Sequence, residues 1–314
     1  PWSDVKKTLI KNTKDITAVW QLTQNHRDKV FDKDNDLFKK SIRRWDDENC
    51  TSKNLGFVDS KKSRVIDKIL EINRQNTFKI LPNSCKDIKD NRLDWKHKYP
   101  TDFYIDFETI SEQLGNLQNI DVEDSRMNTQ IIFMIGVGYE YNDAFHYKVF
   151  RMNHFSLNEE KRILIEFKDF LDNLTRDLDE DNKYFPRLFH WSHAEKSMIE
   201  SAFKRHPSLV RMWKNHHEWI DLCDIFITEP IVVKGSLTFK LKEVANAMFS
   251  HGLITTYWDT TEVSDGLSAM SDGINYYSKI NKTEDDEKNM NSIVNYNRID
   301  CRALWDILKC IREL

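Results

Sequence analysis

A short apolar stretch that ends in two acids constrains the fold of this chain more than any other feature. Residues 103–109 read Phe-Tyr-Ile-Asp-Phe-Glu-Thr, and aromatic and β-branched residues in so short a run predict a buried strand. Because side chains two apart on a strand share a face, Asp106 and Glu108 should project together, opposite Phe107. Buried carboxylates are costly unless a cation compensates them. The stretch therefore predicts a strand that presents paired acids to a divalent metal ion.

The chain is long and apolar enough to hold two folded domains. It has 314 residues, of which 39% are hydrophobic and 12% aromatic, so it can bury a sizeable core. Its net charge of −4 is uneven: residues 1–100 hold 23 Lys and Arg against 15 Asp and Glu, a balance of +8, and the remainder carries −12. A basic N-terminal segment suits nucleic-acid binding, and an acidic remainder suits metal binding. The same charges also fit ordinary solvated surfaces.

Cysteine usage and hydropathy indicate the cellular setting. Cys50, Cys85, Cys223, Cys301 and Cys310 are odd in number and form no Cys-x-x-Cys pair, which is typical of reduced thiols in an intracellular protein. No apolar run approaches the roughly 18 residues that would span a membrane, and no signal peptide is visible. We therefore expect a cytoplasmic or nuclear protein that is not secreted and has no membrane partner.

Residues 1–81 are predicted to form a small, basic, helical domain that is a candidate for binding nucleic acid. An opening helix over residues 2–11 is followed by three stretches in which apolar residues recur at helical spacing. Trp20 and Trp45 are expected in the core of this bundle rather than stacked on bases. Residues 82–100 are polar and are predicted to be a linker. The three stretches are Ile16, Val19, Trp20 and Leu22, with Val30 and Phe31 following; Leu37, Phe38, Ile42 and Trp45; and Val65, Ile66, Ile69, Leu70 and Ile72.

The pattern changes to strands in the second predicted domain, residues 101–314. Gly136 and Gly138 should allow close packing of its second strand. The order of elements predicts an α/β fold with a mixed sheet flanked by helices, and it is similar to the order in RNase H-like folds. The expected elements are strands over 103–106, 130–139, 146–152 and 187–191, helices over 157–174, 193–204, 236–248 and 291–314, a short element near residue 219, a polar loop over 111–127, and an acidic stretch over 259–289 with an exposed turn at 284–287.

Two later segments supply further acids that could join Asp106 and Glu108 in a metal site. Glu195 lies in the first turn of the helix that follows the fourth predicted strand, and an acid at the carboxyl end of a strand can reach a site shared with Asp106. Tyr296 and Asp300 are four residues apart on the closing helix and so share one helix face. We therefore expect Asp106, Glu108, Glu195 and Asp300 to form one carboxylate cluster, with Tyr296 beside it.

Other interpretations of these residues remain open. Glu195 also suits the first turn of any helix, because an acid there interacts favourably with the helix dipole. Tyr296 and Asp300 also fit an ordinary pair on a helix surface, and Asp221 is expected to be a structural acid that caps the next element. Four histidines do not predict a zinc site, since paired cysteines and a clear third ligand are missing from the sequence. These histidines are His190, His193, His216 and His217.

Five short motifs follow one another along the chain: Asp106-Phe107-Glu108, His190 to Glu195, Asp221-Leu222, Ser236-Leu237-Thr238-Phe239-Lys240, and Tyr296-Asn297-Arg298-Ile299-Asp300-Cys301. This series resembles the DEDD 3′–5′ exonucleases, in the subgroup that carries a tyrosine. It is most similar to the predicted RNase-H-like nuclease domain associated with RecB-type nucleases, over about residues 101–314. Residues 14–55 resemble the helical segment before that domain, which is similar to a helix–hairpin–helix unit but is degenerate here because its glycine hairpin is missing.

The resemblance implies a metal-dependent nuclease, most simply a 3′–5′ exonuclease that acts on DNA rather than RNA. Two Mg2+ or Mn2+ ions would lie among Asp106, Glu108, Glu195 and Asp300, since hard oxygen ligands suit these metals. Tyr296 would orient the attacking water. Most DEDD exonucleases have Asp where this chain has Glu195, and Glu can also bind a metal. An upstream RecB-like nuclease or helicase domain is an expected partner.

Residues next to Glu195 are candidates for contacting the terminal nucleotide. His190, Trp191 and His193 lie beside it in the sequence, and core packing is an equal alternative for Trp191.

Two other functions are compatible with the same motifs. An RNase H-like domain can persist as a catalytically silent, nucleic-acid-binding or scaffold module of a larger nuclease or helicase, although this chain retains all four acids and the tyrosine. A structure-selective endonuclease would differ only in its substrate. Stabilisation by divalent metal separates an enzyme from a silent scaffold.

Overall fold

The computed structural model describes residues 2–36, 42–58, 60–111, 130–181, 183–213, 217–258 and 266–314. Some sequence predictions fall outside these ranges. They are the predictions for Leu37, Phe38 and His216, for nearly all of the polar loop over 111–127, and for residues 259–265 of the acidic stretch.

Contacts within the chain divide it into two compact units. The first unit comprises residues 1–91, 223–255 and 310–314, and the second comprises residues 92–222 and 256–309. The sequence predicted contiguous domains with boundaries at residues 81 and 101, whereas the first unit also takes in two segments from the later part of the chain.

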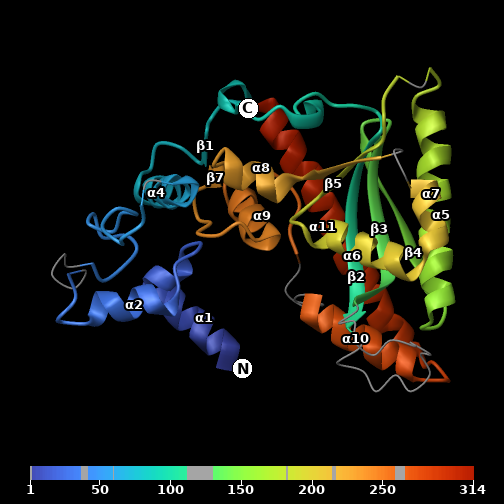
Figure 1. Ribbon diagram of the computed structural model, residues 1–314, viewed down its shortest axis with the longest axis horizontal. Helices are drawn as coiled ribbons and strands as arrows, with labels where there is room; N and C mark the ends of the chain where they lie inside the picture. Colours follow the sequence, from blue (N-terminus) through green and yellow to red (C-terminus); the bar gives the residue numbers. More distant parts are fainter. Residues whose placement is uncertain are drawn as a thin grey trace. The chain divides into compact units, whose positions relative to one another are not determined.

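The second unit is built on a five-stranded mixed sheet with the order β4-β3-β2-β5-β6. Figure 1 labels four of these strands, β2 to β5. β2, β3 and β4 are antiparallel neighbours, whereas β5 and β6 run parallel to β2. Helices flank the sheet, so the predicted α/β architecture is confirmed. β6 occupies the place where the sequence indicated only a short element. The strands are β2 Asp102–Ser111, β3 Gln130–Tyr141, β4 Ala144–Arg151, β5 Arg187–His190 and β6 Glu218–Asp221.

One face of β2 lies in the core of the second unit. Phe103, Ile105 and Phe107 alternate along it and are at most 6% exposed. The ring of Phe107 meets that of Phe167 edge-on, with centroids 6.2 Å apart. Because apolar residues occupy alternate positions, the acids between them are directed to the other face. The helices that contribute to this core include α5 Leu157–Leu178, capped by Ser156, α6 Ala194–Arg205 and α7 Val210–Trp213.

Helix α11 (Glu284–Glu313) lies against the other face of β2 and β3. A Cβ atom placed on Gly136 would lie 1.7 Å from Asn297 Oδ1, and one placed on Gly138 would lie 3.3 Å from Cys301 Cβ. Four residues along α11 therefore advance by two residues of β3, so one row of helix side chains runs along the strand. The two glycines bring α11 directly onto the strand, which is the close packing that the sequence predicts.

The start of α11 corrects one prediction. Residues 284–287, expected as an exposed turn, form its first turn. Thr283 N donates to Asp286 Oδ2 at 2.9 Å, and Asp286 N donates to Thr283 Oγ1 at 3.3 Å. This reciprocal cap begins the helix, and the acids in its first turn interact favourably with the helix dipole. Helix α10 (Gly266–Ser278), which packs against β2, was not predicted from the acidic stretch.

A β-bulge follows Glu108 on β2. The pairing of β2 with β3 shifts there by one residue and leaves Phe133 as the extra residue of β3. The neighbouring Ile132 N donates to Glu160 Oε1 at 2.9 Å, and Glu160 is fully buried and paired with Arg205 at 2.5 Å. The displaced backbone group is thus satisfied by a fixed carboxylate, which stabilises the change in register beside Glu108.

The second unit also includes residues 92–99, which the sequence assigned to a linker. Arg187 is fully buried at the start of β5, and its guanidinium donates to Asp102 Oδ1 at 2.7 Å. Its remaining N–H groups donate to three backbone carbonyls of residues 92–99 at 2.7, 2.8 and 2.9 Å. Because breaking a buried charge network is costly, Arg187 holds this segment firmly against the sheet.

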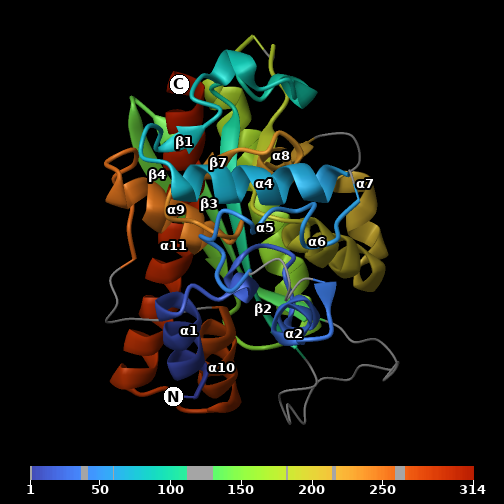
Figure 2. The ribbon, with the colours of Figure 1, turned by 90° about the vertical axis from the view of Figure 1, so that its left-hand side faces the viewer.

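The first unit is mainly helical and contains a small antiparallel sheet of β1 and β7 (Figure 2). This sheet joins residues that are far apart in the sequence, which explains why the unit is discontinuous. β1 is Ile80–Leu81 and β7 is Val232–Val233; the helices are α1 Trp2–Asn12, α2 Gln24–Phe31, α4 Lys61–Arg74, α9 Leu241–Ser250 and, from Cys223 onward, α8 Leu222–Thr228.

The helical prediction for residues 16–22 is wrong. Only a single 3-10 turn, Ile16–Ala18, forms there. The Asp15 carboxylate accepts the Thr17 N–H and caps the start of the turn, and the backbone becomes extended at Val19. Ile16, Val19 and Leu22 are nevertheless buried, and Trp20 is half-buried. Trp20 packs edge-on against Phe239, with ring centroids 5.6 Å apart, as expected of a packing residue. Trp45 lies in an irregular segment rather than in a helix.

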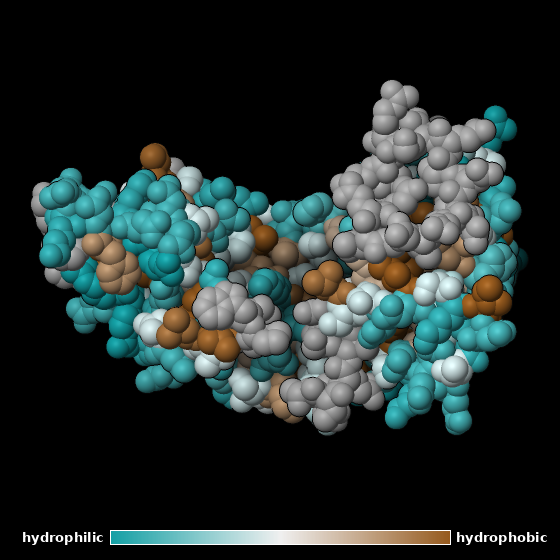
Figure 3. Space-filling model, turned by 90° about the horizontal axis from the view of Figure 1, so that it is seen from below, coloured by the Kyte–Doolittle hydropathy of each residue, from teal (hydrophilic) through white to brown (hydrophobic). Residues whose placement is uncertain are grey.

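The surface in Figure 3 is mostly hydrophilic, and its hydrophobic residues occur in small, separate patches. Within the described ranges, no helix is both long and apolar enough to cross a lipid bilayer.

Candidate active site

The four predicted carboxylates come from three elements of the second unit. Asp106 and Glu108 lie on β2, Glu195 lies in the first turn of α6 just beyond β5, and Asp300 lies on α11. Glu108, Glu195 and Asp300 are 5%, 7% and 7% exposed, whereas Asp106 is partly exposed. Asp106 is therefore the most accessible acid of the four.

The charges of these acids act on one another. Burial raises the pKa of Asp106 well above its ordinary value, and the negative charges of Asp300, Glu108 and Glu195 raise it further. Such effects act between carboxylates that are near one another, so Glu108, Glu195 and Asp300 all lie in the neighbourhood of Asp106, and the four acids are called the carboxylate cluster below. Several negative charges confined in a buried place repel one another, and a bound cation would relieve that repulsion.

Tyr296 belongs to the same cluster. It is 9% exposed, and burial together with the charges of Asp300, Asp106 and Glu108 raises the pKa of its hydroxyl. A hydrogen bond to Asp300 acts in the same direction. The hydroxyl therefore keeps its proton at neutral pH and can donate a hydrogen bond.

Asn297 is a site residue to which the sequence reasoning gave no role. Its Nδ2 donates to Asp106 Oδ2 at 2.7 Å and to Asp106 O at 3.2 Å, and its Oδ1 accepts the Tyr147 hydroxyl at 2.8 Å. Asn297 is completely buried. The available signal was its place directly after Tyr296, because consecutive residues of a helix that lies flat on a sheet can both face that sheet. Asn297 fixes the orientation of the Asp106 carboxylate.

Gly136→Ala should disturb the cluster without touching an acid. The added Cβ would lie 1.7 Å from Asn297 Oδ1, so the Asn297 side chain must move away from Asp106. We expect any activity of the cluster to fall by about 10-fold to 100-fold, the usual effect of losing a residue that orients a metal ligand. Cleavage kinetics and metal titration would measure this. Gly266→Ala is the control, because a Cβ there meets no atom within 4 Å and the backbone is not in the left-handed region that favours glycine. Equal effects of the two substitutions would contradict the role of Asn297.

The turn between β5 and α6 leaves one oxygen of Glu195 without a hydrogen bond. His190 Nδ1 lies 2.6 Å from Ser192 O and 3.3 Å from Glu195 Oε2. Because one Nδ1 hydrogen serves the nearer carbonyl, Glu195 Oε2 is buried without a hydrogen bond. Burial raises the pKa of Glu195, and His190 partly opposes this. Asp221, expected to have a structural role, accepts the Ser192 N–H at 3.0 Å.

The three residues expected to contact a nucleotide differ in their accessibility. His190 is 1% exposed and Trp191 is 8% exposed, which favours the packing alternative for Trp191. His193, at the N-cap of α6, has an exposed side chain. Among these three residues, His193 is therefore the one placed to meet a ligand from solution.

Trp258 is a second site residue that the sequence reasoning missed. Its indole Nε1 donates to Asp300 Oδ1 at 2.7 Å. Trp258 lies in an irregular segment, far from Asp300 in the sequence, so neither periodicity nor motif spacing could indicate the contact. The carboxylates of Asp106 and Asp300 are thus each oriented by a neutral side chain.

The donor set of the cluster fits a hard divalent cation. Its ligating atoms are carboxylate oxygens, which Mg2+ and Mn2+ prefer. The Oε2 of Glu195 is a buried acceptor without a hydrogen bond, and a cation would satisfy it. Within the described residues, however, no three His, Cys, Asp or Glu side chains are already arranged to hold an ion. Ion binding would therefore require the carboxylates to turn toward the metal, which is chemically reasonable for side chains that repel one another.

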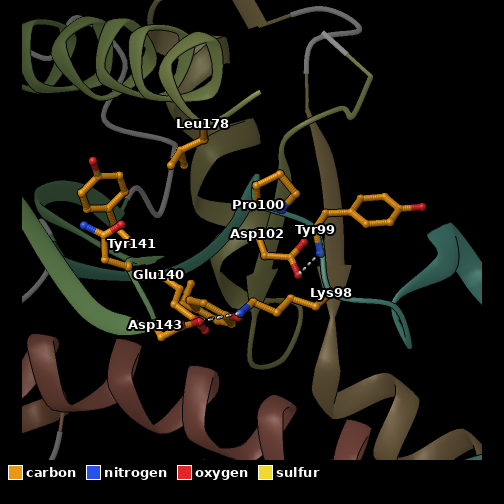
Figure 4. Close-up of a pocket in the computed structure, with 10 residues that line it drawn as sticks. Lys98, Tyr99, Pro100, Asp102, Glu140, Tyr141, Asp143 and Leu178 are labelled. Atoms are coloured by element: carbon orange, nitrogen blue, oxygen red, sulfur yellow. Dashed lines mark hydrogen bonds and ion pairs between the residues drawn. The ribbon is translucent and has the colours of Figure 1, made fainter. Parts of the chain in front are cut away.

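A separate pocket of about 230 Å³ lies toward the start of β2 (Figure 4). Its lining includes Asp102, Tyr141, Leu178 and the ion pair of Lys98 with Glu140. None of the clustered acids lines this pocket, so it is not the cavity in which they would act.

Comparison with known proteins identifies one family. The sequence model of the RNase H superfamily matches residues 119–312, a range that contains Glu195, Tyr296 and Asp300 and begins after the two acids of β2. No curated protein and no solved structure matches the chain.

Proposed function

The chain belongs to the RNase H superfamily, and from this premise we propose that it is a metal-dependent nuclease, specifically a 3′–5′ exonuclease that prefers DNA to RNA. Membership of the superfamily supports a nuclease-type function in general. The observation that carries the proposal is the convergence of Asp106, Glu108, Glu195 and Asp300, whose burial and mutual repulsion raise the pKa of Asp106.

Each acid has a proposed role as a ligand of two Mg2+ or Mn2+ ions. Asp106 is the accessible ligand, and Glu108 and Asp300 are buried beside it. Glu195, which follows the neighbouring strand β5, offers its Oε2, which makes no hydrogen bond. Divalent ions held there would make water easier to deprotonate and would stabilise the charge on the leaving 3′ oxygen.

Tyr296 is proposed to orient the water that attacks the phosphodiester. Its hydroxyl retains its proton, because burial and the neighbouring acids raise its pKa. A protonated hydroxyl fixed against Asp300 is a suitable hydrogen-bond partner for a nucleophilic water. Asn297 and Trp258 contribute by holding the carboxylates of Asp106 and Asp300.

The test is incubation of the protein with end-labelled single-stranded and double-stranded DNA and RNA, in Mg2+, Mn2+ or EDTA. We expect stepwise shortening from the 3′ end in either metal, with DNA cut faster than RNA, and none in EDTA. Internal cuts on branched or looped substrates would indicate a structure-selective endonuclease instead. A protein that neither cleaves nor gains thermal stability from Mn2+ would be a silent scaffold, and the proposal would fail. Adding a RecB-like nuclease or helicase domain is a later test of partnership.

A further inference from the structure

Residues 256–258 are fastened to α11 at two points, both within the second unit. Thr256 N and Oγ1 donate to Asp306 Oδ2 at 2.9 and 2.8 Å, and these groups are buried. Trp258 Nε1 donates to Asp300 Oδ1 at 2.7 Å. Asp300 and Asp306 are six residues apart on one helix, or roughly 9 Å along its axis. This short segment is thus held beside the carboxylate cluster by three hydrogen bonds.

The residue between the two anchors has an exposed aromatic ring. Tyr257 is 56% exposed, whereas Thr256 is 4% exposed and Trp258 is half-buried. Because both neighbours of Tyr257 are turned toward α11, its side chain is directed away from the helix. Consecutive Cα atoms are about 3.8 Å apart, so the ring of Tyr257 lies within one residue of the side chain that contacts Asp300.

We propose that Tyr257 is a stacking platform for an unpaired base of the substrate. This inference rests on the proposed nuclease function and adds a residue of this chain, Tyr257, that would contact an unpaired base of the substrate. Every base has a π-face that can stack on an aromatic side chain, whereas the faces of bases in a duplex are already covered by their neighbours. Tyr257 therefore selects for an unpaired nucleotide beside the cleavage site.

The negative charge of the carboxylate cluster favours an uncharged contact with the substrate at this place. Until metal ions compensate their charge, the four clustered acids repel the phosphates of the substrate, so a neutral ring can hold the nucleic acid where electrostatic attraction is weak. The hydrogen bonds of Thr256 and Trp258 already fix the backbone around Tyr257. Binding a base therefore costs less conformational entropy. His193 is exposed at the same cluster but stands at the start of α6, on a different element.

Binding of a labelled single-stranded DNA to protein that carries Asp106→Asn tests the proposal without cleavage. In this background, Tyr257→Ala should weaken binding by about 10-fold or more, the range found for loss of one stacked base. Tyr257→Trp should retain binding, because it keeps a flat aromatic ring. Tyr141→Ala is the matched control: Tyr141 is 51% exposed but lies at the far end of β3, and its removal should leave affinity unchanged. The melting temperatures of all these variants should match, since each altered side chain is exposed.

A scan of the DNA with single abasic positions locates the contact. One abasic position near the 3′ end should weaken binding to the parent by about 10-fold, yet cause no further loss in Tyr257→Ala. If Tyr257→Ala binds as the parent does, or if every abasic position affects both proteins equally, the stacking role is overturned, while metal-dependent cleavage by the unaltered enzyme would still support the nuclease. If the unaltered protein neither cleaves nor binds any nucleic acid, the proposed function and this inference both fall.

Discussion

Asp106→Asn is expected to reduce metal-dependent cleavage by about 10³-fold or more while the protein remains folded. Asn has the size of Asp, and its carbonyl oxygen can still accept the Asn297 amide, which lies 2.7 Å from Asp106 Oδ2. The substitution removes the negative charge of the most accessible acid, which we propose as a metal ligand. Cleavage of end-labelled DNA in Mg2+ and in Mn2+ measures the effect. Full activity in this variant would exclude the carboxylate cluster as the active site.

The same substitution should stabilise the metal-free protein at neutral pH. Burial and neighbouring acids raise the pKa of Asp106 in the folded state, so the folded state binds this proton more tightly than the unfolded state does. The stability of the parent therefore falls as the pH rises from about 4, the ordinary carboxylate pKa, through the raised value of the folded protein. The Asp106→Asn variant has no carboxylate at this position, so its stability should not show this fall with rising pH. Melting curves in EDTA should thus show a smaller fall in Tm with rising pH for the variant.

Asp143→Asn is the matched control for both measurements. The Asp143 side chain is 99% exposed in the turn between β3 and β4, and its removal changes the net charge by the same amount. We expect its cleavage rate and its dependence of Tm on pH to equal those of the parent. If Asp143→Asn reproduces the stability effect of Asp106→Asn, the cause is total charge rather than repulsion within the cluster.

The acids of the cluster could be placed from the sequence because each depends on a short-range rule. Asp106 and Glu108 follow from the two-residue period of a buried strand, and Glu195 follows from its position where a strand meets a helix. Tyr296 and Asp300 follow from the four-residue spacing of a helix face. The order of strands and helices then sufficed to predict the mixed sheet and its flanking helices.

The residues that orient these acids depend on long-range geometry, which the sequence does not display. The contact of Asn297 with Asp106 requires α11 to lie in one register along β3, and that register depends on Gly136. Trp258 reaches Asp300 from an irregular segment that carries no periodic pattern. The bulge beside Glu108 depends on Glu160, a buried residue of another element.

Secondary structure in the first unit was harder to predict where the apolar residues follow no clear helix or strand periodicity. The apolar spacing of residues 16–22 fits a helix, yet the turn that Asp15 caps at its start ends at Val19, where the backbone is extended. The pairing of β1 with β7 involves two residues from each strand, too few to produce an alternating pattern. Their pairing is nevertheless what brings residues 223–255 into the first unit.

Tyr296→Phe is expected to lower turnover by about 10²-fold while metal binding stays intact. The ring, which is 9% exposed, would still pack between α11 and the sheet, so stability should change by only about 1 kcal/mol for the lost hydrogen bond. Asp300 would keep the Trp258 indole as a partner at 2.7 Å, and the charge of the cluster would not change. Turnover would therefore fall because the attacking water is no longer positioned by the hydroxyl.

Asp300→Asn, one turn further along α11, provides the comparison. It removes a proposed ligand charge, so it should weaken metal binding as well as turnover, seen as a higher Mn2+ concentration at the midpoint of thermal stabilisation. Tyr296→Phe should leave that midpoint unchanged, because a neutral hydroxyl adds little to the attraction between acids and metal. The two variants are thus expected to separate metal binding from chemistry. If both shift the midpoint equally, or if Phe at position 296 supports full turnover, Tyr296 is a packing residue, and the water must be oriented by another group.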